Sequence, residues 1–199
     1  ATALAGAVGR SVEVAPAAPG PLAVATTNLE VRPQADAKAM FAYLNGSRGD
    51  AGLRYVTDIF VHPEAVPLTH IEVPPDARRY GRLAGMRLPL ALLSVYPTTR
   101  DNARPDHEFP YSETGDRTLP RMQRPGEKPV FAVAAAKYPL IVVSGGYNTL
   151  ALWHLTHLKE LAAQGYIVVD PLHGDGRGGD FAGNLSLRGL ALRAAIDNW

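Results

Sequence analysis

Two continuous apolar runs, 138–145 (YPLIVVSG) and 165–171 (GYIVVDP), restrict the fold of this chain more than any other feature. Short runs without polar alternation are typical of strands buried on both faces of a parallel sheet. Between them, apolar residues recur at helical spacing, and Gly165 then ends the pattern; these residues are Ala151, Leu155, Leu158 and Ala162. The order strand, helix, strand predicts a right-handed βαβ unit, so the expected fold class is α/β.

The segments around this unit predict further strands and one more helix. Residues 53–61 (LRYVTDIFV), 68–73 (LTHIEV) and 87–97 (RLPLALLSVYP) are rich in strand-forming residues. Residues 98–130 carry prolines spread among polar residues, which predicts a long surface loop. The last helix is expected to present one face made of Leu192, Ala195, Ile196 and Trp199.

The first 50 residues are expected to form an irregular extension, followed by the α/β part over 51–199. Residues 1–27 are small and proline-rich, which predicts an arm lying over a surface, and 36–44 (DAKAMFAYL) predicts a short helix capped by Asp36. The sequence begins ATALAGAVGR, without an initiator Met, as a mature chain would after removal of an export signal. We therefore expect a secreted or periplasmic protein.

Composition excludes several classes of function. The 20 Lys and Arg residues against 19 Asp and Glu give a net charge of +1, so no strong field favours nucleic acid. No stretch reaches the roughly 18 to 20 apolar residues of a membrane-spanning helix. The chain has no cysteine, which excludes disulfides, thiolate metal sites and a cysteine nucleophile.

The residues after the first apolar run, 144–148 (SGGYN), carry the candidate site. Where a parallel strand leads into a helix, backbone amides converge and the helix dipole favours negative charge. Gly145 and Gly146 let a ligand approach the backbone, and Asn148 can cap the helix. One interpretation is an oxyanion hole whose donor is the backbone N–H of Tyr147. The alternative is a tight turn with no other role. The spacing of a dinucleotide or phosphate loop is absent.

Segments 74–98 and 138–176 resemble α/β-hydrolases of the dienelactone hydrolase and platelet-activating-factor acetylhydrolase type, a group that also contains cutinase-like polyester hydrolases. The resemblance covers about 76–199 and implies the N-terminal part of an α/β-hydrolase with a mostly parallel sheet. It implies that Tyr147 provides the oxyanion amide, that Gly145 and Gly146 shape the turn, and that the Tyr147 ring faces the substrate cleft. Gly145 stands where many members have His, which leaves open how the turn is braced but not the position of the amide.

The same resemblance implies a serine hydrolase of carboxylic esters that needs no cofactor or metal. Its substrate would be a small-molecule or polymeric ester. Residues expected to contact the ester are Gly145, Tyr147, Asn148 and His173, the last in a glycine-rich loop, 172–183, at the carboxyl ends of the strands.

A nucleophile of the expected form is absent from the sequence. The elbow G-x-S-x-G does not occur. Ser144 follows a strand, but Val142 occupies the position where an elbow needs a small residue, and Ser186 is expected to cap a helix. In the family order, the chain stops before any triad member and leaves the 140–143 strand beside an absent fifth strand. We therefore expect the Ser, acid and His on a complementary polypeptide or on a segment missing from this chain.

Two other functions stay open at this point. The chain could be a non-catalytic binding or assembly subunit that keeps a hydrolase scaffold. It could also be a metal-dependent hydrolase, with a cation held by the loop that contains His173, Asp175, Arg177 and Asp180. His154 and His157 are expected on the solvent side of the first helix, and Asp106, His107 and Glu108 on the long loop.

Overall fold

The computed structural model describes residues 20–27, 68–108, 116, 118–123, 127–146, 154–173 and 181–199. Its strands are β1 (Ala23–Thr27), β2 (Leu68–Glu72), β3 (Arg87–Thr98), β4 (His107–Glu108), β5 (Thr118–Leu119), β6 (Leu140–Val142) and β7 (Ile167–Leu172). Its helices are α3 (Ala77–Tyr80), the 3₁₀ helix η2 (Gly81–Leu83), α4 (Leu155–Ala163) and α5 (Phe181–Asp197). The predictions for 36–44 and 53–61 lie outside the described residues.

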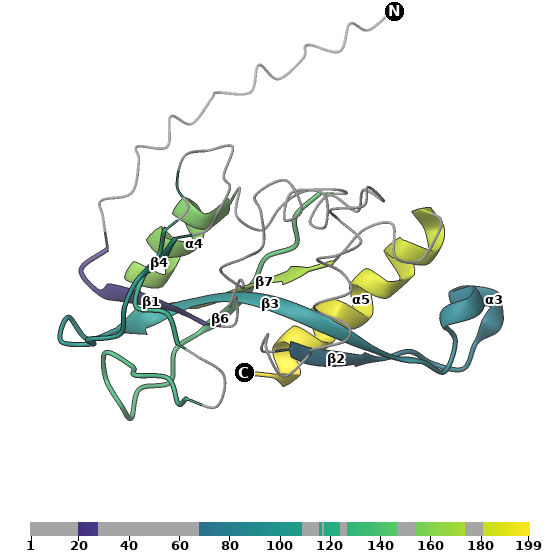
Figure 1. Cartoon of the computed structure of the whole chain (residues 1–199), viewed down its shortest axis with the longest axis horizontal. Helices are drawn as coiled ribbons and strands as arrows, with labels where there is room; N and C mark the ends of the chain where they lie inside the picture. Colours follow the sequence, from purple (N-terminus) through teal and green to yellow (C-terminus); the bar gives the residue numbers. More distant parts are fainter. Residues whose placement is uncertain are drawn as a thin grey trace, which may run out of the picture.

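The main sheet has five strands in the order β1-β3-β7-β6, with β2 also paired to β3 (Figure 1). The pairs of β3 with β1, β2 and β7 are antiparallel, and only β6 and β7 are parallel. The prediction of a mostly parallel sheet was therefore wrong for the described strands. Helix α4 connects the two strands of the parallel pair, β6 and β7, as a helix usually does between parallel strands.

The two helices pack against the main sheet. Successive side chains of a strand point to opposite faces, so the buried strand residues fall into two sets. Leu90, Leu92 and Tyr96 of β3 pack in one cluster with Ala191 and Ala195 of α5. The intervening buried positions of β3 and β7, which point to the opposite face, are Leu93, Val95 and Val168. Helix α4 contacts β3 and β7 and buries Leu155, Leu158 and Ala162, as its sequence periodicity predicted.

Strand β6 differs from its prediction. The run 138–145 was expected to be buried on both faces, but the strand covers only Leu140–Val142, and all three residues are half-buried. It lies at the end of the sheet and pairs with β7 alone among the described strands. A strand at a sheet edge has a neighbour on one side only, so its side chains receive less cover than those of a central strand.

Helix α5 also differs from its prediction in two respects. Ala195 is fully buried, but Ile196 is 53% exposed, and Ala191 takes the second buried position of the face. Two alanines four residues apart let the helix approach the sheet closely. Ser186, expected as a cap, lies inside the helix instead.

Strand β1 lies within the predicted extension, where the sequence showed no strand pattern. It pairs with β3 from Ala23–Thr98 to Thr27–Ser94. Its other side is covered by the long loop, because the Thr26 amide donates to the Pro120 carbonyl over 2.9 Å and the Gln123 amide donates to the Thr26 carbonyl over 2.8 Å. The loop therefore satisfies backbone groups that an open edge strand would leave unpaired.

The described chain is thus a mixed α/β structure in which α4 and α5 pack on a largely antiparallel sheet. Within the described residues, no helix is both long enough and apolar enough to cross a membrane.

Candidate functional site

Ser144 and His173 meet where the two parallel strands end. The Val143 amide donates to the Val169 carbonyl over 2.8 Å, which extends the β6–β7 ladder by one residue, so Ser144 is the first residue beyond it. The Ser144 Oγ atom lies 3.0 Å from His173 Nε2. Sequence analysis named both residues, and the parallel register brings them together although they are 29 positions apart.

Arg188 of α5 holds the glycine turn that follows Ser144. Its Nη1 atom donates to the Gly145 carbonyl over 2.6 Å, and its Nη2 atom donates to the Gly146 carbonyl over 2.8 Å. Each glycine carbonyl thus accepts a bond from a different nitrogen of the planar guanidinium fork. We call these two bonds the Arg188 clamp. They brace the turn in this chain, where Gly145 stands in place of the His that many hydrolases of the resembled group have.

The clamp also sets the direction of a backbone amide. The described residues contain no cis peptide bond, and in a planar trans peptide the N–H points opposite to the carbonyl. Because the Gly145 carbonyl points at Arg188, the Gly146 N–H of the same peptide points away from it. Gly146 and Ser144 are both exposed, so this N–H belongs to an accessible stretch of backbone. Tyr147 and Asn148, predicted to share the site, lie outside the described residues.

A buried carboxyl group, that of Asp170, lies in β7 three residues before His173. Asp170 is 1% exposed, and its Oδ2 atom makes no hydrogen bond. Burial raises the pKa of this carboxyl to about 7, against the opposing effect of the Arg188 charge. Near neutral pH it therefore exists as a mixture of the acid and its anion.

Sequence analysis missed Arg188, although a signal for it was present. Arg188 precedes Ala191 by three residues and Ala195 by seven, so it lies on the face of α5 that packs on the sheet. An arginine on a buried helical face needs acceptors. The sequence gives no indication that those acceptors are carbonyls 42 and 43 residues earlier.

The other predicted clusters do not form a second site in the described residues. His154 is partly buried just before α4 and His157 is exposed. Among the described residues, no three His, Asp or Glu side chains are grouped so that they could hold a metal ion. Asp175, Arg177 and Asp180 lie outside them. Asp106 accepts from the Arg121 amide, and Glu108 accepts from Thr118, so these two carboxylates brace the β4–β5 hairpin.

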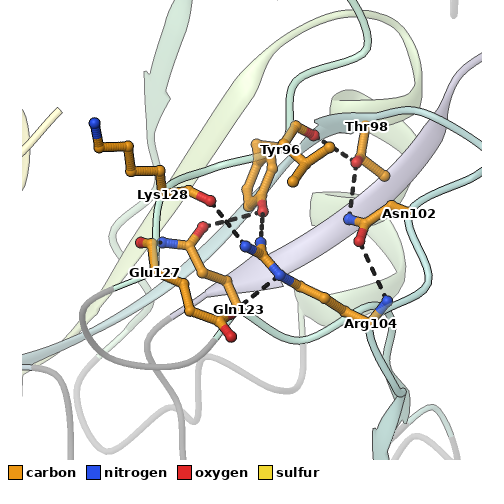
Figure 2. Close-up of polar contacts among 8 residues, drawn as sticks. Tyr96, Thr98, Asn102, Arg104, Gln123, Glu127 and Lys128 are labelled. Atoms are coloured by element: carbon orange, nitrogen blue, oxygen red, sulfur yellow. Dashed lines mark hydrogen bonds and ion pairs between the residues drawn. The ribbon is translucent and has the colours of Figure 1, made fainter.

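A larger polar cluster lies under the long loop, at the end of β3 (Figure 2). Arg104 forms an ion pair with Glu127 at 3.0 Å and donates to the Lys128 carbonyl at 2.9 Å and to the Tyr96 hydroxyl at 3.4 Å. Tyr96 in turn donates to Gln123 at 3.0 Å. We call Tyr96, Arg104, Gln123 and Glu127 the loop anchor.

The loop anchor has the properties of a structural network. Tyr96 is fully buried, and desolvation raises its pKa although the Arg104 charge opposes this, so the hydroxyl stays protonated and can donate. The Gln123 amide nitrogen donates to the Glu127 carbonyl over 2.7 Å. Because its polar groups bond one another, the anchor ties the loop to the sheet and leaves little capacity for a ligand.

The Ser144–Gly146 turn with His173 and Arg188 is therefore the candidate site. It combines a turn of exposed backbone, held by Arg188, with the Ser144–His173 pair at its base, and fixed amides in such a turn can stabilise a developing oxyanion. Comparison of the chain with models of protein families, with curated protein sequences and with solved structures finds no match.

Proposed function

We propose that this chain is part of a serine-type carboxylic ester hydrolase, to which it contributes the oxyanion-binding turn and part of the substrate cleft. The observation that carries the proposal is the Arg188 clamp. By fixing both glycine carbonyls, Arg188 fixes the peptide planes on which the N–H donors lie. The Gly146 N–H is one donor. The Tyr147 N–H, the donor predicted from the sequence, shares its peptide with the Gly146 carbonyl.

The chemistry follows from that arrangement. When a serine oxygen attacks an ester carbonyl, negative charge develops on the carbonyl oxygen, and fixed N–H donors stabilise it more than they stabilise the neutral ester. A general base takes the serine proton during this attack and passes it to the alkoxide as the intermediate collapses, so that an alcohol leaves and an acyl-serine remains, which water hydrolyses. Donors held before the substrate arrives need no reorganisation at that moment.

The position of the strands adds support from a separate part of the structure. The resemblance implies that a further strand borders the 140–143 strand, and β6 lies at the end of the described sheet. We propose that a complementary polypeptide pairs there and brings the Ser, acid and His. No described residue favours a metal-dependent hydrolase, and a binding subunit alone would not need clamped peptide planes.

Replacing Arg188 tests the proposal. Hydrolysis of short p-nitrophenyl esters is measured on the protein purified under mild conditions, with gel filtration and intact mass to detect a second chain. We expect Arg188→Met to lower kcat by about 10- to 100-fold with little change in KM, because the donors act on the transition state. The matched control is Arg193→Met, since Arg193 lies on the same helix, is exposed and forms a surface ion pair with Asp197.

Two results would contradict the proposal. One is the absence of ester hydrolysis from every preparation, including any that contains a second chain. The other is equal activity of the Arg188→Met and Arg193→Met proteins, which would separate the clamp from the reaction.

A further inference from the structure

The glycine turn is attached to the fold on two sides, by groups from two different elements. Arg188 reaches it from α5 and bonds the carbonyls of Gly145 and Gly146. His173, which directly follows β7, reaches Ser144 at the start of the turn. One attachment therefore lies immediately before the glycines and the other lies on them.

We infer that His173 is a positioning residue for the oxyanion-binding turn and that it acts through Ser144. The inference rests on the proposed function for the role of the turn. It adds a positioning role for His173 that neither the sequence motif nor the Arg188 clamp assigns. His173 was expected to contact the ester. That role stays a prediction, and the structure places its Nε2 atom 3.0 Å from the Ser144 hydroxyl oxygen, within hydrogen-bond distance.

The need for a second attachment follows from the sequence of the turn. Two consecutive glycines have the largest backbone freedom of any residue pair, and fixing one residue costs roughly 1 to 2 kcal/mol in conformational entropy. Arg188 fixes the carbonyls, but rotation at the strand end could still move both peptides together. Ser144 is the first residue beyond the β6–β7 ladder, so a bond to its side chain holds the turn at the point where the ladder stops.

The place of His173 in the fold suits this role. The residue before it, Leu172, is the last of β7 and pairs with Ala91 of β3, and the first half of β7 also pairs with β6. A side chain that starts next to a central strand has a well-fixed base, and His173 is itself partly buried. Ser144, by contrast, is exposed and comes from the edge strand. The bond thus ties the less constrained segment to the more constrained one.

Amide hydrogen exchange at the base of the turn tests the inference without requiring activity. In the full chain, Ser144→Ala and His173→Phe each remove one side of the bond. We expect the Val143 amide, whose bond to the Val169 carbonyl is the last of the β6–β7 ladder before Ser144, to exchange about tenfold faster. Ser144→Thr keeps a hydroxyl and should restore slow exchange. His157→Phe is the matched control, because His157 is exposed on α4 and its loss should leave the turn unchanged.

Kinetics separate a positioning role from a purely structural one. In preparations that hydrolyse esters, Ser144→Ala and His173→Phe should lower kcat several-fold at nearly constant KM, and Ser144→Thr should recover most of it. A fluorophosphonate probe, which marks serine nucleophiles, should leave Ser144 unlabelled.

The outcomes distinguish this inference from the proposed function. Unchanged exchange in Ser144→Ala and His173→Phe would overturn the inference while Arg188→Met could still support the hydrolase. Labelling of Ser144 by the probe would also overturn it, since Ser144 would then be the nucleophile and His173 its base. Faster exchange together with a lack of ester hydrolysis would support the two-sided attachment of the turn and contradict the proposed hydrolase function.

Discussion

The loop anchor and the candidate site both use an arginine to hold a loop, and they differ in what remains available afterwards. Arg104 bonds a buried hydroxyl, a carboxylate and a carbonyl, and only 19% of its side chain is exposed. Arg188 bonds two backbone carbonyls of a turn whose neighbouring Ser144 and Gly146 are exposed. The first arrangement is centred on the buried Tyr96, although Glu127 and Lys128 are exposed. The second fixes the backbone of an exposed turn, which a ligand can reach.

This difference shows how structural and functional polar clusters can be separated. A network whose members satisfy one another contributes to folding and has little left to offer a substrate. A cluster that fixes the backbone but keeps donors accessible loses conformational entropy and gains few buried hydrogen bonds. This combination is typical of functional sites rather than of cores. Variants in the two regions should therefore change different observables.

The largest expected effect concerns Asp170, beneath the candidate site. Its pKa rises from an ordinary 3.8 to about 7 in the folded chain through burial, so the folded state binds more protons and loses stability as pH rises from about 4 to 7. Asp170→Asn should therefore stabilise the protein at pH 8, by on the order of 2 to 4 kcal/mol, and much less at pH 4.5. Urea unfolding at both pH values measures this.

Asp116 provides the control of opposite sign for that experiment. Burial would raise its pKa, but hydrogen bonds from Lys159 and Thr156 outweigh this and lower it. The Asp116 carboxylate therefore stabilises the folded state above the pKa that Asp116 has in the unfolded chain, and this stabilisation is lost as pH falls. Asp116→Asn should reduce stability at pH 8. If Asp170→Asn raised the free energy of unfolding equally at both pH values, ionisation of the Asp170 carboxyl would not be the cause of the stabilisation.

The next effect sharpens the comparison of the two arginines. Arg104→Met removes one donor each from Glu127, the Lys128 carbonyl and the buried Tyr96 hydroxyl, and we expect a loss of about 2 kcal/mol in the free energy of unfolding. Arg188→Met should cost about 1 kcal/mol or less, since its carbonyl acceptors lie near solvent. Thermal and urea unfolding of both variants check this, and equal losses would remove the distinction between the regions.

The smallest effect concerns the hydroxyl at the centre of the loop anchor. Tyr96→Phe removes the donor to Gln123 and an acceptor of Arg104 but keeps the ring, so about 1 to 2 kcal/mol of stability should be lost. Ester hydrolysis, where present, should be unchanged. Tyr166→Phe is the control, because Tyr166 is 36% exposed. A fall in activity with Tyr96→Phe would show that the loop anchor and the site are coupled.

Sequence patterns predicted the elements that local periodicity controls. The helical repeat identified the buried face of α4, and the apolar run at 165–171 matches the buried strand β7. The same reasoning failed at β6, because an apolar run does not reveal whether the strand has one neighbour or two. It also failed at β1, whose residues become a strand only through pairing with β3.

At the candidate site, the sequence indicated the glycine turn and His173, and it suggested an anion-binding corner. It did not indicate that Ser144 meets His173 or that Arg188 bonds the turn. The role of the Tyr147 amide stays a prediction. Motif spacing can show that a turn is able to bind an anion, but the group that braces the turn comes from a distant element.

The sequence alone determined which segments form α4 and β7, where the glycines free the backbone, and that no thiol chemistry is available. Only the tertiary structure decided that β3 runs antiparallel to three neighbours, that the long loop is anchored through Tyr96, and that residues 29 to 43 positions apart meet around the turn. The physical reason is the distance along the chain over which each signal acts. Periodicity records which face of one element is buried, whereas strand register and helix packing, set by the whole core, decide which distant side chains meet.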